Sequence, residues 1–206
     1  MSRFANGLNI CVVVLAAGLS RRMGYPKQLL LSSNGMPLVR CVAETALASV
    51  ADTVFVVVPP KGSGVEAALE GLPVRTLENP LAHEGLSTSL HVAVREMVRV
   101  NADAIVILLG DQPGISLDSI DGVIDAFVRH GKRFVQVKYR DGYGHPVLFS
   151  RALFPELMNC KGDEGGRQVV ARHREERFAV PMETVSPPDI DTPEDYQRFL
   201  NACSRA

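Results

Sequence analysis

The sequence lacks four features that would each place a protein in a particular class. It has no excess of one charge, because 22 Lys and Arg residues are balanced by 23 Asp and Glu residues, which argues against a nucleic-acid-binding surface. Its four cysteines have neither CxxC nor zinc-finger spacing, so we expect neither a disulfide framework nor a zinc site. No apolar run is long enough to span a bilayer, and no signal-peptide pattern is evident. We therefore expect a cytoplasmic protein without nucleic-acid or membrane partners.

The rest of the composition is that of an ordinary globular protein, with 46% hydrophobic and 22% charged residues. A chain of 206 residues buries about 70% of its unfolded surface, and no linker or internal repeat divides this one. We expect a single domain over residues 1–206. Its first part, about residues 9–140, carries a regular alternation of predicted strands and helices. Its second part, about residues 141–206, lacks this alternation and is expected to close over the first.

Apolar runs alternate with helical spacing over the first two thirds of the chain. Runs typical of strands, several of them unbroken and therefore buried on both faces, lie at residues 10–16, 53–58, 74–77, 104–109 and 134–139. Helical spacing is found at residues 37–46, 65–69, 87–98 and 117–128. Asp141-Gly142 then predicts a hairpin turn, and Thr192-Pro193 predicts the start of a last helix. This alternation predicts an α/β fold with three layers and a Rossmann-like, mostly parallel sheet.

A loop with bare backbone and local positive charge follows the first predicted strand. Residues 15–20 read Leu-Ala-Ala-Gly-Leu-Ser, and the cations Arg22 and Lys27 follow. Small residues let another group approach the main chain closely, and successive backbone N–H groups in a tight turn form an anion-binding nest. Directly after a buried strand, such a loop favours phosphate binding. The alternative is a glycine turn followed by a solvated basic face.

The ordered string at residues 15–24, followed by Pro-Lys-Gln-Leu-Leu at 26–30, resembles the signature of the nucleotidyltransferases that use a nucleoside triphosphate and release pyrophosphate. Within that superfamily the chain most resembles the MobA/MocA branch, which attaches a nucleotide to molybdopterin. The resemblance implies the fold of the nucleotide-diphospho-sugar transferases, with residues 9–140 as the nucleotide-binding half and residues 141–206 as the acceptor-binding half. It implies catalytic roles for Arg22 and Lys27 as charge stabilisers. It also implies nucleotide binding by Leu15, Ala16, Ala17, Gly18, Ser20, Arg22 and Lys27.

Two carboxylates are candidate ligands of a metal ion. Asp111 follows the apolar run at 104–109 after Gly110, and Mg²⁺ prefers one or two carboxylates together with phosphate oxygens and water. Asp is also common in turns, but the family's metal aspartate, which is also catalytic, falls at this position. The family's closing motif has a second metal-facing residue, which Asp191 matches, although a helix cap is a competing explanation there. We expect Asp111 and Asp191 to bind Mg²⁺.

The segment from Asn79 to Leu90 resembles the family loop that approaches the nucleoside. In an open parallel sheet, ligands bind beyond the carboxyl ends of the strands, so this segment should meet the loops at 17–27 and 110–113. Ser87 or Ser89 could contact the ribose or base. Either could instead cap a helix whose expected apolar face consists of Leu90, Val94, Met97 and Val98.

The acceptor side is expected from two further motifs, Gly-His-Pro at 144–146 and the segment at 162–167, which resemble motifs of the molybdopterin branch. They imply acceptor binding by His145, Asp163 and Arg167. A lone His is more often a packed, hydrogen-bonded residue, and Arg167 could instead pair with nearby acids. No strong general base is required, because an acceptor phosphate is already an anionic nucleophile.

The reaction that the resemblance implies is Mg²⁺-dependent transfer of CMP from CTP onto molybdopterin, and a molybdoenzyme could receive the product. CTP is favoured because guanylyltransferases more often have a second Gly where this chain has Ala17, and an Asp where it has Pro26. GTP, or another phosphorylated acceptor such as a sugar phosphate or phospholactate, stays an alternative. So does a dinucleotide oxidoreductase, although the first loop lacks GxGxxG, and so does a non-catalytic maturation module for a molybdoenzyme.

Overall fold

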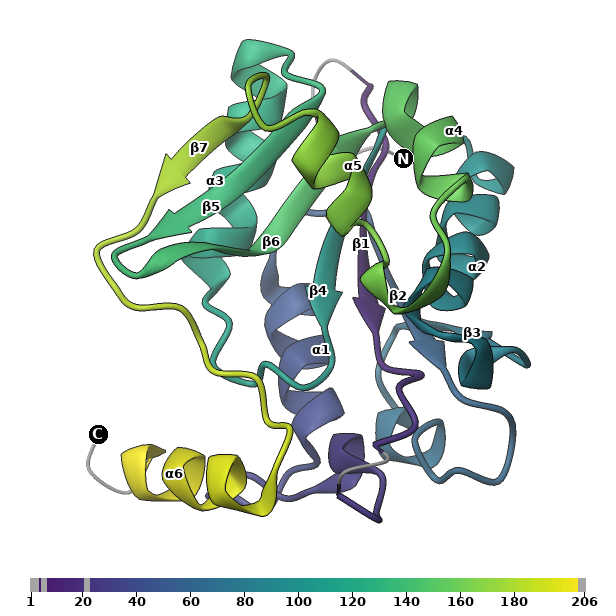
Figure 1. Ribbon diagram of the computed structural model, residues 1–206, viewed down its shortest axis with the longest axis vertical. Helices are drawn as coiled ribbons and strands as arrows, with labels where there is room; N and C mark the ends of the chain where they lie inside the picture. Colours follow the sequence, from purple (N-terminus) through teal and green to yellow (C-terminus); the bar gives the residue numbers. More distant parts are fainter. Residues whose placement is uncertain (1–3, 5–6, 21–22, 204–206) are drawn as a thin grey trace.

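The computed structural model describes residue 4, residues 7–20 and residues 23–203 of the protein. Within these residues the chain forms a seven-stranded sheet with the strand order β3-β2-β1-β4-β6-β5-β7 (Figure 1). The strands are β1 (Ile10–Leu15), β2 (Thr53–Val58), β3 (Arg75–Glu78), β4 (Ala104–Leu109), β5 (Phe134–Tyr139), β6 (Gly142–Ser150) and β7 (Phe178–Pro181). The α-helices are α1 (Leu38–Ala48), α2 (Leu86–Arg99), α3 (Leu117–His130), α4 (Phe154–Met158), α5 (Arg167–Arg172) and α6 (Pro193–Cys203).

The sheet is mostly parallel, as the sequence predicts. Strand β1 pairs in parallel with β2 on one side and β4 on the other, and β3 continues the parallel order. Strand β6 is antiparallel to both β4 and β5, and β7 is parallel to β5. A hairpin turn joins β5 to β6, as predicted, but its loop residues are Arg140 and Asp141, because Gly142 already pairs with Tyr139 as the first residue of β6. Because Leu15 pairs with Leu109 at the carboxyl ends of β1 and β4, the loops after these two strands lie side by side.

Strand β1 is buried on both faces, as its unbroken apolar sequence requires. Its even-numbered residues pack in one hydrophobic cluster with α1 and α3, and its odd-numbered residues pack in another with α2 and α4. Helices α1 and α3 therefore cover one face of the sheet, while α2, α4 and α5 cover the other (Figure 1). The two clusters hold the sheet as the middle of three layers, with the loop after β1 at its edge.

Three local predictions are wrong. Val98 is 51% exposed, because it lies one position, or about 100°, beyond Met97 and leaves the buried stripe. Neither Ser87 nor Ser89 is the cap of α2, because the helix begins one residue earlier and has Gly85 as its N-cap. Residues 65–69 form only the short 3-10 turn η2 (Ala67–Leu69), since glycines at 62, 64 and 71 adopt positive φ on both sides of it.

Candidate active site

Lys27 lies between the carboxylates of Asp111 and Asp191. Its Nζ is 2.5 Å from Asp111 Oδ2 and 2.6 Å from Asp191 Oδ1. Lys27 begins the short turn η1 (Lys27–Leu29), Asp111 follows β4, and Asp191 precedes α6. The side chains of Lys27 and Asp111 are only 12% and 18% exposed, against 33% for Asp191, so the Lys27–Asp111 pair is largely shielded from water. The fold thus joins three of the predicted site residues across up to 164 positions of sequence.

This cluster has more negative than positive charge. Burial alone would lower the pKa of the Lys27 ammonium, but the charge of Asp111 and hydrogen bonds to Asp111 and Asp191 raise it above its usual value. Asp189 is close enough that burial, together with the charges of Asp111 and Asp191, raises the pKa of its carboxyl group. Asp189 lies in the predicted closing motif but had no predicted role. Lys27 therefore stays protonated at neutral pH, and the acids around it favour a further cation.

The loop after β1 is held in place by a glutamine that the sequence reasoning missed. Gln28 is buried, and its Nε2 donates to the backbone oxygen of Gly18 at 2.6 Å. Ser20, with a positive φ of 50°, donates through Oγ to Gln28 Oε1 and accepts the backbone N–H of Lys27. The sequence did contain a signal for this role, because Gln28 is the polar residue in the otherwise apolar run 28–31. Ser20 and Gln28 thus fix the loop beside the Lys27 ammonium.

Close packing between two loops delivers Asp111 to Lys27. A Cβ at Gly110 would lie 2.9 Å from the Cβ of Ala16, and the Gly110 N–H donates to the backbone oxygen of Leu15 at 3.0 Å. A side chain at position 110 would push the loops apart. The buried Ala16 therefore supports the site from beneath, through packing between the loops.

A cavity of about 410 Å³ opens beside Lys27, and we name it the lysine cavity. Its lining residues are Ala17, Gly18, Leu19, Ser20, Lys27, Ala82, His83, Gly85, Leu86, Ser89, Asp163 and Asp191. Asp163, expected on the acceptor side, lies here because the turn η5 (Gly162–Glu164) packs against Gly85, where a Cβ would be 2.8 Å from Asp163 Oδ1. Ser89 Oγ accepts a hydrogen bond from Asn79 Nδ2 at 2.9 Å. Ser87 is buried but does not line this cavity.

A second cavity, of about 480 Å³, adjoins the first, because Leu86 lines both. We name it the amide cavity after Gln112 and Gln136. Its apolar wall includes Leu15, Leu86, Leu90, Ile107, Leu109, Val147, Phe149 and Val170, and its polar wall includes Gln112, Gln136, Tyr143, His145, Glu164, Arg167, Arg177 and Asp189. Leu15, which was predicted to bind nucleotide, thus lies on this cavity. His145 and Arg167 lie here together, as expected for one binding surface.

His145 is neutral at physiological pH. Burial lowers the pKa of its imidazole to about 4, an effect that the positive charge of Arg167 adds to and the negative charge of Asp111 opposes. Its backbone oxygen accepts a hydrogen bond from Tyr139 Oη at 2.7 Å. His145 can therefore offer a neutral hydrogen-bonding ring to a ligand, but not a positive charge.

Arg22 lies outside the described residues. Within residues 4, 7–20 and 23–203, no group of three or more His, Cys, Asp or Glu side chains is arranged to hold a metal ion by itself. Asp111 and Asp191 nevertheless fit a hard divalent cation, because their oxygens already converge on one positive charge and such cations prefer carboxylate oxygens. In the same part of the chain, no helix is long and apolar enough to cross a bilayer.

The fold and the position of this site beyond β1 and β4 define the class of the protein as a nucleotidyltransferase with the nucleotide-diphospho-sugar transferase fold. Residues 12–177 match the family of MobA-like NTP transferase domains, and the chain belongs to this family. The resemblance read from the first loop is thereby confirmed at the level of the family.

Relatives with different names share this family. The chain is 32% identical to the purine catabolism protein PucB of Bacillus subtilis, over 93% of this chain and 96% of PucB. It is 26% identical to the nicotine blue oxidoreductase of Paenarthrobacter nicotinovorans, over 91% of this chain and 95% of that protein. The crystal structure of Rv0371c of Mycobacterium tuberculosis in complex with manganese superposes with a TM-score of 0.79 at 31% identity, covering 94% of this chain and 99% of that one.

Proposed function

We propose that this nucleotidyltransferase transfers CMP from CTP onto the terminal phosphate of molybdopterin and releases pyrophosphate. One observation carries the proposal: Lys27 Nζ lies within 2.6 Å of both Asp111 and Asp191, at the end of the small-residue loop and beside the lysine cavity. A triphosphate in that cavity would meet backbone N–H groups and an ammonium. The adjoining amide cavity, with His145 and Arg167, would receive the acceptor.

Asp111 and Asp191 would hold a divalent cation, for which we propose Mg²⁺. The ion would neutralise triphosphate charge, and phosphate oxygens would complete its coordination, as is usual for Mg²⁺ in phosphoryl-transfer sites. The manganese complex of Rv0371c supports the use of a divalent ion in the family. Lys27 would turn from the two carboxylates toward the triphosphate, since both cations cannot neutralise the same oxygens.

The residues of this chain contribute positioning and charge. An oxygen of the acceptor phosphate attacks the α-phosphorus of CTP in line, the bond from that phosphorus to the bridging oxygen breaks, and the electron pair leaves with pyrophosphate. Lys27, and Arg22 by its place in the motif, stabilise the charge that develops on the phosphoryl oxygens and the leaving group. The loop at 17–20 orients the phosphates. Ser89 lines the lysine cavity, in which the nucleoside would also lie. No side chain of this chain needs to remove a proton.

CTP is proposed over GTP because of position 17. Ala17 is buried and lines the lysine cavity, so its methyl group takes up room that a glycine would leave. A narrower pocket favours a pyrimidine over a purine. GTP in the same reaction is the alternative.

The deciding experiment measures pyrophosphate release from molybdopterin, Mg²⁺ and either CTP or GTP. We expect release with CTP that exceeds release with GTP and requires the acceptor. Faster release with GTP would show that the nucleotide is GTP and not CTP. Turnover only with a sugar phosphate or phospholactate would show that the acceptor is not molybdopterin.

The relationship to nicotine blue oxidoreductase makes an oxidoreductase the second candidate, and for such a reaction we propose a dinucleotide as the cosubstrate. A thermal-shift measurement separates the two. Stabilisation by CTP that requires Mg²⁺ supports the transferase, whereas stabilisation by NAD without a metal supports the oxidoreductase. Binding of CTP without any turnover would instead favour a maturation module.

A further inference from the structure

Three buried polar atoms without a partner belong to residues of the amide cavity. They are Gln112 Oε1, Gln136 Oε1 and Arg177 Nε, none of which has a hydrogen-bond partner among the described residues. Gln112 and Gln136 are each only 7% exposed. A buried polar group left unsatisfied costs about 1–3 kcal/mol, so three such groups around one cavity point to a ligand that satisfies them.

The chemical role of each atom is set by its neighbours. Gln112 Nε2 donates to Asp189 Oδ1 at 2.8 Å, and Gln136 Nε2 donates to the backbone oxygen of Gly144 at 3.1 Å. Since a carboxylate and a carbonyl oxygen only accept, neither amide can be turned round without losing its bond. Both glutamines therefore offer an acceptor oxygen. The two acceptors come from different elements, the loop after β4 and strand β5.

Arg177 supplies the matching donor. Its guanidinium carbon lies 3.9 Å from the centroid of the Tyr143 ring and 5.6 Å from that of Phe134, so the planar group is held against aromatic rings. A guanidinium keeps its protons at any physiological pH, which makes the free Nε–H a permanent donor. The residues that line the cavity thus contribute two acceptor atoms and one donor that have no partner, beside an apolar wall.

We propose that the amide cavity binds the amino-oxopyrimidine edge of a flat fused heterocycle, with Gln112 and Gln136 accepting from its two N–H donors and Arg177 donating to its ring carbonyl. This inference rests on the proposed function, because the pterin of the acceptor carries such an edge. Guanine carries the same edge. Cytosine does not, because it has one N–H donor on that edge and two acceptors, so the base of CTP does not fit this set.

The experiment compares two ligands that differ at this edge. Pterin has an amino group where lumazine has an oxygen, which would face a glutamine oxygen and repel it. Fluorescence or calorimetric titration of the full chain should show pterin binding at least about tenfold more tightly than lumazine, because a site built to donate and accept at fixed places rejects a mismatched analogue. Gln136→Met should reduce this ratio to about twofold or less. Gln197→Met, at an exposed glutamine of α6, should leave the ratio unchanged.

Several outcomes would overturn the inference. Equal binding of pterin and lumazine by the unmodified chain would do so without any variant. A ratio retained in both Gln136→Met and Gln112→Met, with folding confirmed by circular dichroism, would remove the glutamines from recognition. Guanosine is the second arm: if it binds more tightly than pterin and GTP displaces it, the edge is read on a nucleobase and the acceptor assignment fails.

The result is independent of the assay for the proposed function. Discrimination between pterin and lumazine needs no turnover, so a chain that discriminates but releases no pyrophosphate keeps this inference and loses the proposed reaction. If the chain releases pyrophosphate but binds pterin and lumazine equally, the proposed reaction stands and the inference about the ring edge is wrong.

Discussion

The two cavities share Leu86 but differ in the chemical groups that they offer to a ligand. Lys27, which lines the lysine cavity, has its ammonium at contact distance from the carboxylates of Asp111 and Asp191, and charged groups of both signs suit a site where charge is redistributed. The amide cavity has an apolar wall, a neutral imidazole and amide oxygens without partners, which suit recognition of an uncharged ring. The closely paired charges thus lie where the chemistry is proposed. The neutral polar groups without partners lie where selection is proposed, beside the charged side chains of Glu164, Arg167, Arg177 and Asp189.

The strongest test of this contrast is to remove one charge of each sign from the cluster of Lys27, Asp111 and Asp191 beside the lysine cavity. Asp111→Asn and Lys27→Met should each lower turnover by about a hundredfold or more, because preorganised charges in a shielded site carry much of the stabilisation of the transition state. Their effects on the metal should be opposite. In calorimetry without nucleotide, Mn²⁺ should bind more tightly to Lys27→Met, which frees two carboxylates, and more weakly to Asp111→Asn.

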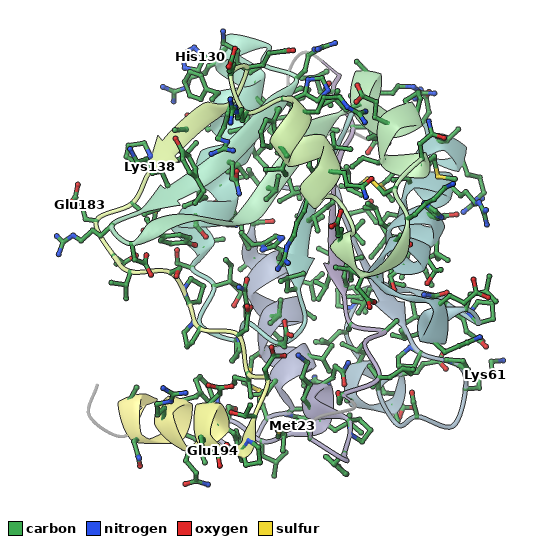
Figure 2. The ribbon with its side chains drawn as sticks, in the orientation of Figure 1. Met23, Lys61, His130, Lys138, Glu183 and Glu194 are labelled. Carbon is green, nitrogen blue, oxygen red and sulfur yellow. The ribbon has the colours of Figure 1, made fainter. Side chains whose placement is uncertain are left out.

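Lys61→Met provides the matched control, since Lys61 projects from an exposed loop (Figure 2) and lines neither cavity. It should change neither turnover nor Mn²⁺ binding. A Lys27→Met protein with near-normal turnover would take Lys27 out of the mechanism. Unchanged Mn²⁺ affinity in that variant would mean that the ammonium does not compete for the carboxylates.

The fold and the lysine cavity could largely be predicted from the sequence, because each depends on local patterns. Strands β2, β4 and β5 have the predicted bounds; the apolar runs of β2 and β4 are nearly unbroken, whereas β5 also contains Gln136 and Lys138. The meeting of Lys27 with Asp111 follows from the rule that loops beyond parallel strands converge. The direct ion pair was not predicted, because the same pattern suits a lysine that faces only phosphates.

The amide cavity could be predicted only in part, because the residues that define it have no shared motif. Gln136 was a detectable signal, as a single amide among the apolar residues of β5. Arg177 gave none, since an arginine near the chain surface is usually solvated, and its contact with Tyr143 depends on how β6 and the segment before β7 meet. Asp163 was assigned to the acceptor because its motif also contains Arg167, but η5 turns it toward the lysine cavity.

The neutral state of His145 in the amide cavity can be tested by changing the pH. The pKa of His145 is about 4 in the folded protein, against about 6.5 when unfolded, so between these values the unfolded chain takes up a proton that the native chain does not. This stability is present above about pH 6.5 and is lost as the pH falls toward 4. Between pH 7 and pH 4.5 it amounts to about 2 kcal/mol.

Urea unfolding at the two pH values should therefore show a smaller loss of stability in His145→Asn than in the unmodified chain. His130→Asn, at an exposed histidine of α3 (Figure 2), controls for the removal of a histidine. If His145→Asn and the unmodified chain lose stability equally on acidification, the imidazole is already protonated in the native state, and His145 does not offer a neutral ring to the cavity.

The smallest expected effect concerns how Asp191 reaches the lysine cavity. Thr192 Oγ1 accepts the Asp195 N–H at 3.2 Å, and Asp195 Oδ2 accepts the backbone N–H groups of Thr192 and Asp191, so a reciprocal cap at the start of α6 also orients the carboxylate beside Lys27. Thr192→Val should cost about 1 kcal/mol of stability and weaken Mn²⁺ binding by a few-fold, without altering the pterin-to-lumazine ratio. Thr45→Val, which removes a hydroxyl bonded within α1, should leave Mn²⁺ binding unchanged. Lost stability with unaltered Mn²⁺ affinity would show that Asp191 is held by its ion pair alone, whereas a change in the ratio would show that the two cavities are not independent.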